Sequence, residues 1–278
     1  MRTVQGPIGF VGAGALTDAL AGGLLAAGVP PERMWVCNRG HADRLERFRQ
    51  VGLRATPSKA DVADASDLLV LAVKPADAAA ALDELRPSLR PRHRIVSCMA
   101  GISTAYVEAA LGGQPRVVRA MPNIASAVRA SATAISPGRY ADGADIDAAS
   151  ALLQAVGEVV RVDEPLLDAV TALAGSGPAY VYCLVDAMVA AASDLGLPEP
   201  VAMQLALRTV AGAARLALET ERRPADLRAA VSSPGGTTVA GVGVLEAGGF
   251  AALVAAALRR AAERSEELGR QWVQPPPG

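Results

Sequence analysis

The segment of residues 232–238, Ser-Ser-Pro-Gly-Gly-Thr-Thr, has a composition suited to binding a small anion. Pro234 and the two glycines that follow it interrupt an otherwise helical pattern, which resumes at Val239. Four hydroxyl side chains accompany small residues that leave backbone N–H groups uncovered beside a helix N-terminus. This combination favours a carboxylate ligand, although a helix-breaking loop with an N-cap has the same composition.

A glycine pair near the start of the chain has the pattern of a dinucleotide-binding turn. The predicted first strand ends at Val11, and Gly12-Ala13-Gly14 follows it directly before a helical pattern. In that context the first glycine makes the tight turn and the second lets the backbone approach a pyrophosphate at the helix N-terminus. Thr17 occupies the third position of the motif, where Gly or Ala is usual. The predicted cofactor contacts here are Gly12, Ala13, Gly14, Ala15 and Leu16.

The end of the predicted second strand distinguishes between the two nicotinamide dinucleotides. NAD-binding chains place Asp or Glu there to accept a hydrogen bond from the ribose 2′-OH. This chain has Asn38-Arg39, with no acidic residue beside the arginine. A guanidinium suits a 2′-phosphate, so the pattern predicts NADP(H), with NAD(H) as a weaker alternative. An ordinary surface arginine is the other interpretation of Arg39.

Three further strand ends carry turn residues that we expect to contact the cofactor. Ligands of open parallel sheets bind beyond the carboxyl ends of the strands, so these exits should meet at one crevice. Each of these segments on its own is equally consistent with turn residues that simply end a strand and begin a loop. The predicted contacts are Ala72, Val73, Lys74 and Pro75 after one strand, Ala100 and Gly101 after the next, and Met121, Pro122 and Asn123 after a third.

The elements that must position these residues fall into two regions with different periodicity. Residues 1–163 alternate short apolar runs, at 8–11, 34–37, 68–73, 95–97 and 117–119, with helical patterns. This alternation predicts an α/β domain of the Rossmann type, a doubly wound parallel sheet that binds NADP. Residues 164–278 show only helical patterns, at 179–195, 201–219 and 251–268, and predict an all-α substrate-binding and dimerisation domain.

The predicted helix at residues 201–218 is apolar on most of its faces. A helix of this kind is buried on several sides, either in a monomeric bundle or between subunits. We favour a subunit interface, because a second domain this small has little interior in which to bury such a helix. The chain is therefore expected to form a homo-oligomer.

Composition excludes several other classes of protein. The 278 residues are 51% hydrophobic and 20% charged, which is sufficient for a hydrophobic core. The net charge of −1 gives no positive electrostatic potential that would attract nucleic acid or an anionic membrane. No apolar run is expected to reach the length of a membrane span, and a strand directly after the N-terminus leaves no room for a signal peptide. Three scattered cysteines indicate reduced thiols in a cytoplasmic protein, and no metal-ligand spacing occurs. The tail at 274–278 is expected to be disordered.

Taken in order, these segments resemble the pyrroline-5-carboxylate reductases, which catalyse the last step of proline biosynthesis. The resemblance covers nearly the whole chain, and its most specific parts are residues 175–180 and 233–238. It implies a Rossmann domain, a helical domain interleaved in a dimer, and in many members a pentamer of dimers. The resemblance rests on residues 9–16, 38–39, 72–75, 100–102, 119–123, 174–180, 186–187, 196–198, 212–214, 233–238 and 245–246.

The resemblance also implies the roles of the hydroxyl loop. The loop would hold the substrate carboxylate, with the Thr238 hydroxyl near the ring nitrogen. From the residues themselves, Ser176 and Thr171 are candidate second contributors to carboxylate binding, and capping of helices is the equal alternative for both. Thr238 and Ser233 are the candidate catalytic residues. The candidate substrate contacts are Ser233, Gly235, Gly236, Thr237, Thr238 and Ser176.

The chain departs from the family pattern at several positions. Ile124 and Ala125 replace the Thr-Pro that usually follows Met-Pro-Asn, and Arg208 replaces a common Gln. Lys59 stands where an Asn is common near the cofactor phosphate, so Lys59 is a further predicted cofactor contact. Arg223 replaces a common His. These departures leave open which cyclic imine is the substrate.

The predicted reaction is hydride transfer from NADPH to the C=N carbon of L-1-pyrroline-5-carboxylate, which yields L-proline. An imine nitrogen can take its proton from water near neutral pH, so no strong general base is required. This agrees with a second half that has neither histidine nor lysine. A six-membered piperideine carboxylate is an alternative substrate. A non-catalytic NADP-binding interaction protein is an alternative of another class.

Overall fold

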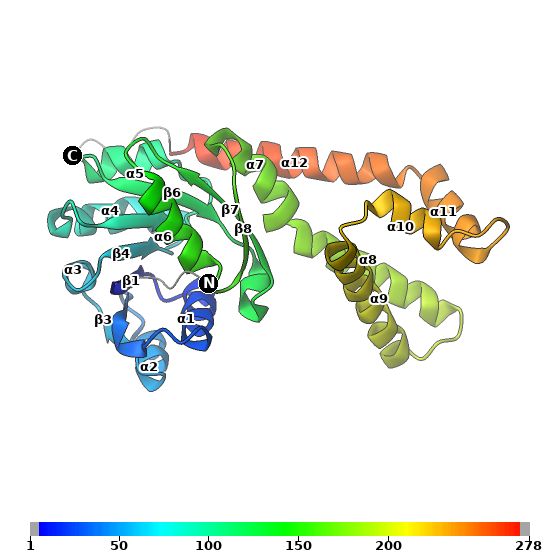
Figure 1. Ribbon diagram of the computed structural model, residues 1–278, viewed down its shortest axis with the longest axis horizontal. Helices are drawn as coiled ribbons and strands as arrows, with labels where there is room; N and C mark the ends of the chain where they lie inside the picture. Colours follow the sequence, from blue (N-terminus) through cyan, green and yellow to red (C-terminus); the bar gives the residue numbers. More distant parts are fainter. Residues whose placement is uncertain (1–5, 273–278) are drawn as a thin grey trace. The chain divides into compact units, whose positions relative to one another are not determined.

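The computed structural model describes residues 6–272, and the chain forms two compact units (Figure 1). The first unit comprises residues up to 176 together with residues from 260 onward, and the second comprises residues 177–259. The tail predicted to be disordered, residues 274–278, lies outside the described residues.

The first unit contains an eight-stranded sheet in the order β3-β2-β1-β4-β5-β6-β7-β8. Neighbouring strands are parallel except for β6 and β7, which are antiparallel. The order from β3 to β6 is that of the doubly wound dinucleotide-binding fold, with the direction of crossing reversed between β1 and β4. The strands are β1 (Ile8–Val11), β2 (Met34–Cys37), β3 (Arg54–Thr56), β4 (Leu68–Leu71), β5 (Arg94–Ser97), β6 (Arg116–Met121), β7 (Ser131–Pro137) and β8 (Gly157–Arg161).

Helices cover both faces of this sheet, which explains why the central strands are apolar without alternation. Phe10 of β1 belongs to the core on one face and Val11 to the core on the other, because successive side chains of a strand point to opposite sides. The first core is closed by α1 (Ala15–Ala26), α2 (Ala42–Gln50) and α6 (Gly143–Leu153). The second is closed by α3 (Lys59–Asp64), α4 (Ala78–Leu85) and α5 (Thr104–Leu111).

The five predicted strands are present, and the structure adds β3, β7 and β8. These three carry weak strand signals. β3 has only three residues, and β8 is partly exposed along its whole length. In β7 the hydroxyl residues Ser131, Thr133 and Ser136 are buried, so its composition resembles that of a loop although it lies inside the sheet.

The chain leaves the sheet after β8 through a 3₁₀ turn at Glu164–Leu166, helix α7 (Leu167–Val170) and a π-helical turn at Thr171–Gly175. The end of α12 (Phe250–Arg270) belongs to the same unit. Ser265 Oγ donates a hydrogen bond to Asp168 Oδ1 at 2.5 Å, and the Trp272 ring packs edge-on against Tyr106 at 5.7 Å between centroids. Contacts distant in the sequence therefore hold both segments to the first compact unit.

The second unit is helical, as predicted, and has a small core. Its helices are α8 (Gly177–Asp194), α9 (Glu199–Thr220), α10 (Pro224–Ala230), α11 (Thr237–Ala247) and the first part of α12. Val185 and Val189 of α8 pack with Ala202 and Ala206 of α9. Many other large apolar side chains are exposed, among them Leu205, Leu216, Leu218, Val244 and Leu253.

Two helical stretches correct the expectation about membrane spans. Glu164–Asp194, with 31 residues, and Glu199–Thr220, with 22, are long and apolar enough to cross a membrane by length and composition. The first stretch reaches this length because the short turns after Glu164 run on into α8, whereas the second is the single helix α9. Only 17% and 11% of their most apolar windows are buried inside the chain, so these surfaces require another covering.

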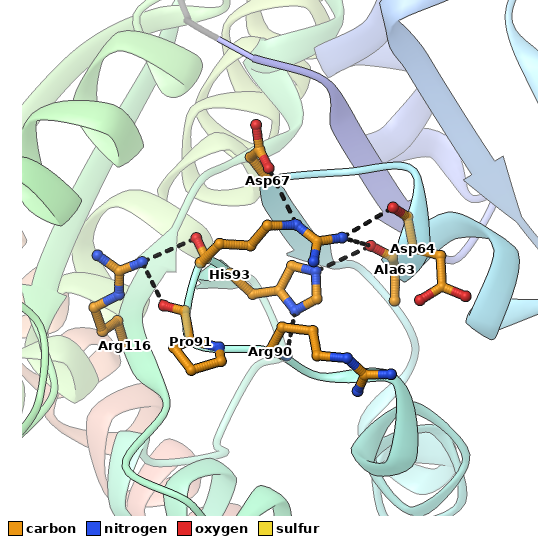
Figure 2. A network of polar contacts seen from close by, with 8 residues as sticks. Ala63, Asp64, Asp67, Arg90, Pro91, His93 and Arg116 are labelled. Atoms are coloured by element: carbon orange, nitrogen blue, oxygen red, sulfur yellow. Dashed lines mark hydrogen bonds and ion pairs between the residues drawn. The ribbon is translucent and has the colours of Figure 1, made fainter.

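A polar network fixes the loop that leads into the N-terminal end of β5 (Figure 2). The buried His93 accepts a hydrogen bond from the Arg90 backbone N–H at its Nδ1, 2.9 Å away. Its Nε2 therefore carries the proton and donates to the Ala63 carbonyl at 3.0 Å. Arg116 closes the network by donating to the carbonyl of Pro91. Burial, which disfavours the charged imidazole, lowers the pKa of His93.

Candidate active site

The turn after β1 depends on two residues of the glycine motif. Gly12 adopts φ +115°, a conformation that favours glycine, and its N–H donates to the Cys37 carbonyl at 3.0 Å. A Cβ at this position would lie 2.6 Å from the Ala72 carbonyl oxygen. Thr17, the departure at the third position, is fully buried and donates its hydroxyl to the Gly12 carbonyl at 2.7 Å. Thr17 therefore stabilises the turn through a hydrogen bond that Gly or Ala could not make.

The N-terminus of α1 is uncapped. Gly14 is its N-cap, and no side chain accepts from the first N–H groups of the helix. The space beside Gly14 is open, because a Cβ there would have no neighbour within 4 Å. Free N–H groups at an open helix N-terminus form a site for a phosphate group.

A cavity of about 410 Å³ lies over this turn. It brings together nine of the predicted cofactor residues: Gly12, Ala13, Gly14, Asn38, Arg39, Lys59, Ala72, Val73 and Lys74. The other predicted cofactor residues do not line it: Ala15, Leu16, Pro75, Ala100, Gly101, Met121, Pro122 and Asn123. Sequence reasoning missed seven lining residues: Cys37, His41, Arg44, Asp77, Ala80, Ala81 and Glu84.

Glu84 joins the two cations predicted to bind the cofactor phosphate. Its carboxylate contacts Arg39 Nη1 at 2.5 Å and Lys59 Nζ at 2.7 Å. The Lys59 side chain is 11% exposed and that of Arg39 is 77% exposed. The hydrogen bond from Lys59, assisted by the positive charges of Lys59 and Arg39, lowers the pKa of Glu84. Glu84 is therefore an anion at neutral pH.

Two further observations bear on whether NADP fits this cavity. The Asn38 side-chain Nδ2 is buried and has no hydrogen-bond partner in the structure, so a donor is available to a ligand. Burial raises the pKa of the Cys37 thiol to about 11, so Cys37 is neutral near pH 7 and is not a nucleophile. With the bare helix N-terminus and the cations, the residues present fit a dinucleotide that carries an additional phosphate.

The predicted cofactor residues that follow β5 and β6 contact other parts of the first unit instead of the cavity. Asn123 donates through Nδ2 to the Ala174 carbonyl at 3.0 Å and accepts through Oδ1 from the Ala125 N–H at 3.1 Å. A Cβ on Gly101 would lie 3.5 Å from the Gly269 backbone nitrogen near the end of α12. Ile124, where the family has a hydroxyl residue, is 68% exposed. Asn123 therefore orders its own turn and tethers the π-helical turn in this structure.

The hydroxyl loop connects α10 to α11 within the second unit. Gly236 N donates to the Ser233 carbonyl at 2.9 Å, and Gly235 adopts φ +69°. Gly236 is the N-cap of α11, and no side chain caps this helix. The Thr238 side chain is half-buried in the first turn of α11, whereas Ser233 is exposed. The loop thus presents hydroxyls and an uncapped helix N-terminus, as the sequence predicts.

Ser176 lies at the end of the first unit, and the hydroxyl loop lies in the second. The Ser176 N–H closes the π-helical turn by donating to the Thr171 carbonyl at 2.8 Å. The Thr171 hydroxyl donates to the Leu167 carbonyl of its own helix at 2.7 Å. Between residues 6 and 272, no group of three or more His, Cys, Asp or Glu side chains is placed to hold a metal ion.

The doubly wound sheet, the uncapped glycine turn and the cavity lined by Arg39 and Lys59 are those of an oxidoreductase that uses a nicotinamide dinucleotide. Two family models match the chain. One, described as NADP oxidoreductase coenzyme F420-dependent, covers residues 7–101. The other, described as pyrroline-5-carboxylate reductase dimerisation, covers residues 164–268.

Individual proteins match over almost their whole length. The pyrroline-5-carboxylate reductase of Pseudomonas aeruginosa is 42% identical over 96% of this chain and 98% of its own. Pyrroline-5-carboxylate reductase 2 of Bacillus subtilis is 39% identical over 96% of each. The chain therefore belongs to the pyrroline-5-carboxylate reductase family.

Solved structures agree with this assignment. A pyrroline-5-carboxylate reductase from Coxiella burnetii superposes with a TM-score of 0.90 and 38% identity, over 95% of this chain and 98% of that one. A Plasmodium falciparum pyrroline carboxylate reductase with NADP bound has a TM-score of 0.83 and 25% identity, over 96% and 99% of the two chains. As the dimerisation model covers α8, α9 and α11, the chain is a homo-oligomer whose exposed apolar helices lie in the assembling region.

Proposed function

We propose that this protein reduces L-1-pyrroline-5-carboxylate to L-proline with NADPH, the final step of proline biosynthesis. The observation that carries the proposal is the full-length match to enzymes of this name, at 37–42% identity, in a chain that keeps both the cationic cavity and the hydroxyl loop. The cofactor is NADP(H), which the residues of the cavity fit.

The first unit supplies the cofactor site. The N-terminus of α1 holds the pyrophosphate, with Gly12 keeping the turn open and the Asn38 amide donating to the ligand. Arg39 and Lys59 hold the 2′-phosphate. When bound, the dinucleotide supplies the hydride. Ala100 and Met121–Asn123 are retained from the family pattern as proposed contacts of its nicotinamide half, with rearrangement of the Asn123 hydrogen bonds.

The hydroxyl loop supplies the substrate site in this proposal. Ser233 and the N–H groups of Gly236 and Thr237 hold the substrate carboxylate, at a helix N-terminus that no side chain caps. The Thr238 hydroxyl bonds the ring nitrogen. Water supplies the proton for this nitrogen, which agrees with the absence of His and Lys after residue 93.

The exposed apolar surfaces of α8 and α9 assemble the protein. We assign them to an interface between two copies of the chain rather than to a membrane, because the dimerisation region of the family covers both helices. A large obligate interface has the hydrophobic character of a core divided in two. The proposed state is a dimer that can assemble further into a pentamer of dimers. The proposed location is the cytoplasm.

A six-membered imino acid is the second candidate substrate. Ile124 replaces a hydroxyl residue of the family and is 68% exposed, so the turn after β6 presents an apolar surface. An apolar surface there favours a larger or less polar ring over the five-membered one.

Steady-state oxidation of NADPH tests these assignments. Turnover is measured with pyrroline-5-carboxylate and with a piperideine carboxylate, each with NADPH and with NADH. We expect the highest kcat/KM for the five-membered ring with NADPH. A higher kcat/KM for the six-membered ring would select the second candidate. NADPH binding without turnover of either would refute the enzymatic function.

A further inference from the structure

We propose that Glu84 sets the selectivity of this protein between NADPH and NADH by competing with the 2′-phosphate for Arg39 and Lys59. This inference rests on the cofactor class of the proposed function. Nothing in the dinucleotide-binding motif itself includes Glu84, which lies on α4, away from the glycine turn and from the end of β2.

The geometry shows one carboxylate shared by two cations. Its Oε1 atom lies 2.5 Å from Arg39 Nη1, and its Oε2 atom lies 2.7 Å from Lys59 Nζ. Three elements therefore converge, since Arg39 follows β2 and Lys59 begins α3. Among the described residues, Glu84 is the only carboxylate that pairs with either cation.

The position of Glu84 makes it a substitute for the ligand. A carboxylate and a phosphate present similar acceptor oxygens, and both prefer paired cationic donors. Glu84 thus holds Arg39 and Lys59 as a phosphate would and places them in the same cavity wall. A phosphate entering this wall gains the two cations but meets the negative charge that already neutralises part of their field.

The same carboxylate favours the other cofactor. Rossmann proteins that use NAD have an acidic side chain that accepts from the ribose 2′-OH, usually at the end of β2. Here that position holds Asn38-Arg39, and the acidic group comes from α4 instead. Glu84 can accept from a 2′-OH, but it repels a 2′-phosphate. We therefore expect Glu84 to keep the protein less selective for NADPH than Arg39 and Lys59 alone would make it.

The chain offers a matched control on the same helix. Asp83 precedes Glu84 and does not line the cavity. Its carboxylate lies 3.9 Å from Arg86 and is 59% exposed. Asp83→Asn removes the same charge from α4 as Glu84→Gln does, but away from Arg39 and Lys59, so a general electrostatic effect can be separated from a specific one.

The test measures binding of two adenosine fragments to the full-length protein by isothermal titration calorimetry, without turnover. Adenosine 2′,5′-bisphosphate carries the distinguishing phosphate, and adenosine 5′-monophosphate does not. In E84Q we expect the bisphosphate to bind about 3- to 10-fold more tightly at low salt, as suits a partly exposed charge, while the monophosphate does not gain. Glu84→Ala should show the same direction, and D83N should change neither affinity by more than about 2-fold.

Opposite results would overturn the inference. The inference fails if the ratio of bisphosphate affinity to monophosphate affinity in both Glu84 variants equals that of wild type. It also fails if this ratio changes equally in D83N. In either case Glu84 would only hold Arg39 and Lys59 in place, without affecting cofactor selectivity. Full turnover of pyrroline-5-carboxylate with such an unchanged ratio would refute the role of Glu84 and leave the proposed reaction intact. A shifted ratio in a protein without turnover would support Glu84 and refute the reaction.

Discussion

Removing the Glu164 carboxylate should destabilise the first unit more than removal of any exposed acid. Glu164 follows β8 and accepts three hydrogen bonds. Thr104 donates through its N–H at 2.8 Å and its hydroxyl at 2.5 Å, and Arg119 donates through Nη1 at 3.2 Å. One side chain therefore joins the start of α5, the strand β6 and the chain leaving the sheet. Glu164→Ala is the informative change.

The size of the effect follows from burial. The Arg119 side chain is 9% exposed, and it would keep its charge after losing its only carboxylate among the described residues. Breaking a buried pair by removing one partner costs about 3–5 kcal/mol. Glu164 is 24% exposed, so water partly replaces it, and we expect Glu164→Ala to cost about 2–4 kcal/mol. Glu164→Gln keeps an acceptor oxygen and should cost about 1–2 kcal/mol.

Equilibrium urea unfolding followed by tryptophan fluorescence measures this loss. Both tryptophans, Trp35 and Trp272, belong to the first unit, so the signal reports on the unit that contains the network. Measurements at several protein concentrations separate unfolding from dissociation of the oligomer. Glu158→Ala, which removes an exposed acid from β8, is the control.

A double-mutant cycle identifies the source of the loss. Arg119→Met removes the buried charge, so adding Glu164→Ala to it should cost at least about 1 kcal/mol less than Glu164→Ala alone. The reasoning is refuted if Glu164→Ala lies within about 0.5 kcal/mol of wild type, or if the two losses simply add.

Four other substitutions test the site and the fold. Thr238→Val should lower kcat about 10-fold and Ser233→Ala should raise KM about 10-fold, both with unchanged NADPH affinity; wild-type kinetics in Thr238→Val would mean that the loop is only structural. Arg39→Glu should weaken NADPH at least about 10-fold more than NADH in fluorescence titrations, and equal losses would refute the 2′-phosphate contact. The lowered pKa of His93 makes the folded state take up its proton below the ordinary value of about 6.5, so stability present above that value is lost as the pH falls. When the pH is lowered from about 7.5 to about 5.5, the melting temperature of His93→Gln should therefore fall less than that of wild type. An equal fall in the two proteins would contradict this assignment.

The glycine turn was predictable because its requirements are local. A positive φ at Gly12 and an open helix start at Gly14 follow from the types of neighbouring residues. Thr17, by contrast, was only a departure from the motif in the sequence. Its hydroxyl bond to the Gly12 carbonyl required the folded turn, which also buries the side chain completely.

Strands were predicted correctly where helices cover both faces of the sheet and every side chain of the strand is buried. β1 and β4 are buried at every position, so their apolar runs are unbroken. β7 was missed because Ser131 and Thr133 lie buried within it and hydrogen-bond each other at 3.0 Å. Serine and alanine, which make up most of this strand, have little preference for strands, so the segment gives only a weak strand signal.

The sequence by itself determined five of the eight strands, the dinucleotide turn, the hydroxyl loop and the apolar surfaces of α8 and α9. Each of these follows from backbone preferences or periodicity within a short segment. Only the tertiary structure decided that Glu84 meets Arg39 and Lys59, which are 45 and 25 residues away in the chain. Such a meeting depends on strand order and on how α3 and α4 pack against the sheet. Because contacts between elements form only when the whole sheet assembles, no local pattern encodes them.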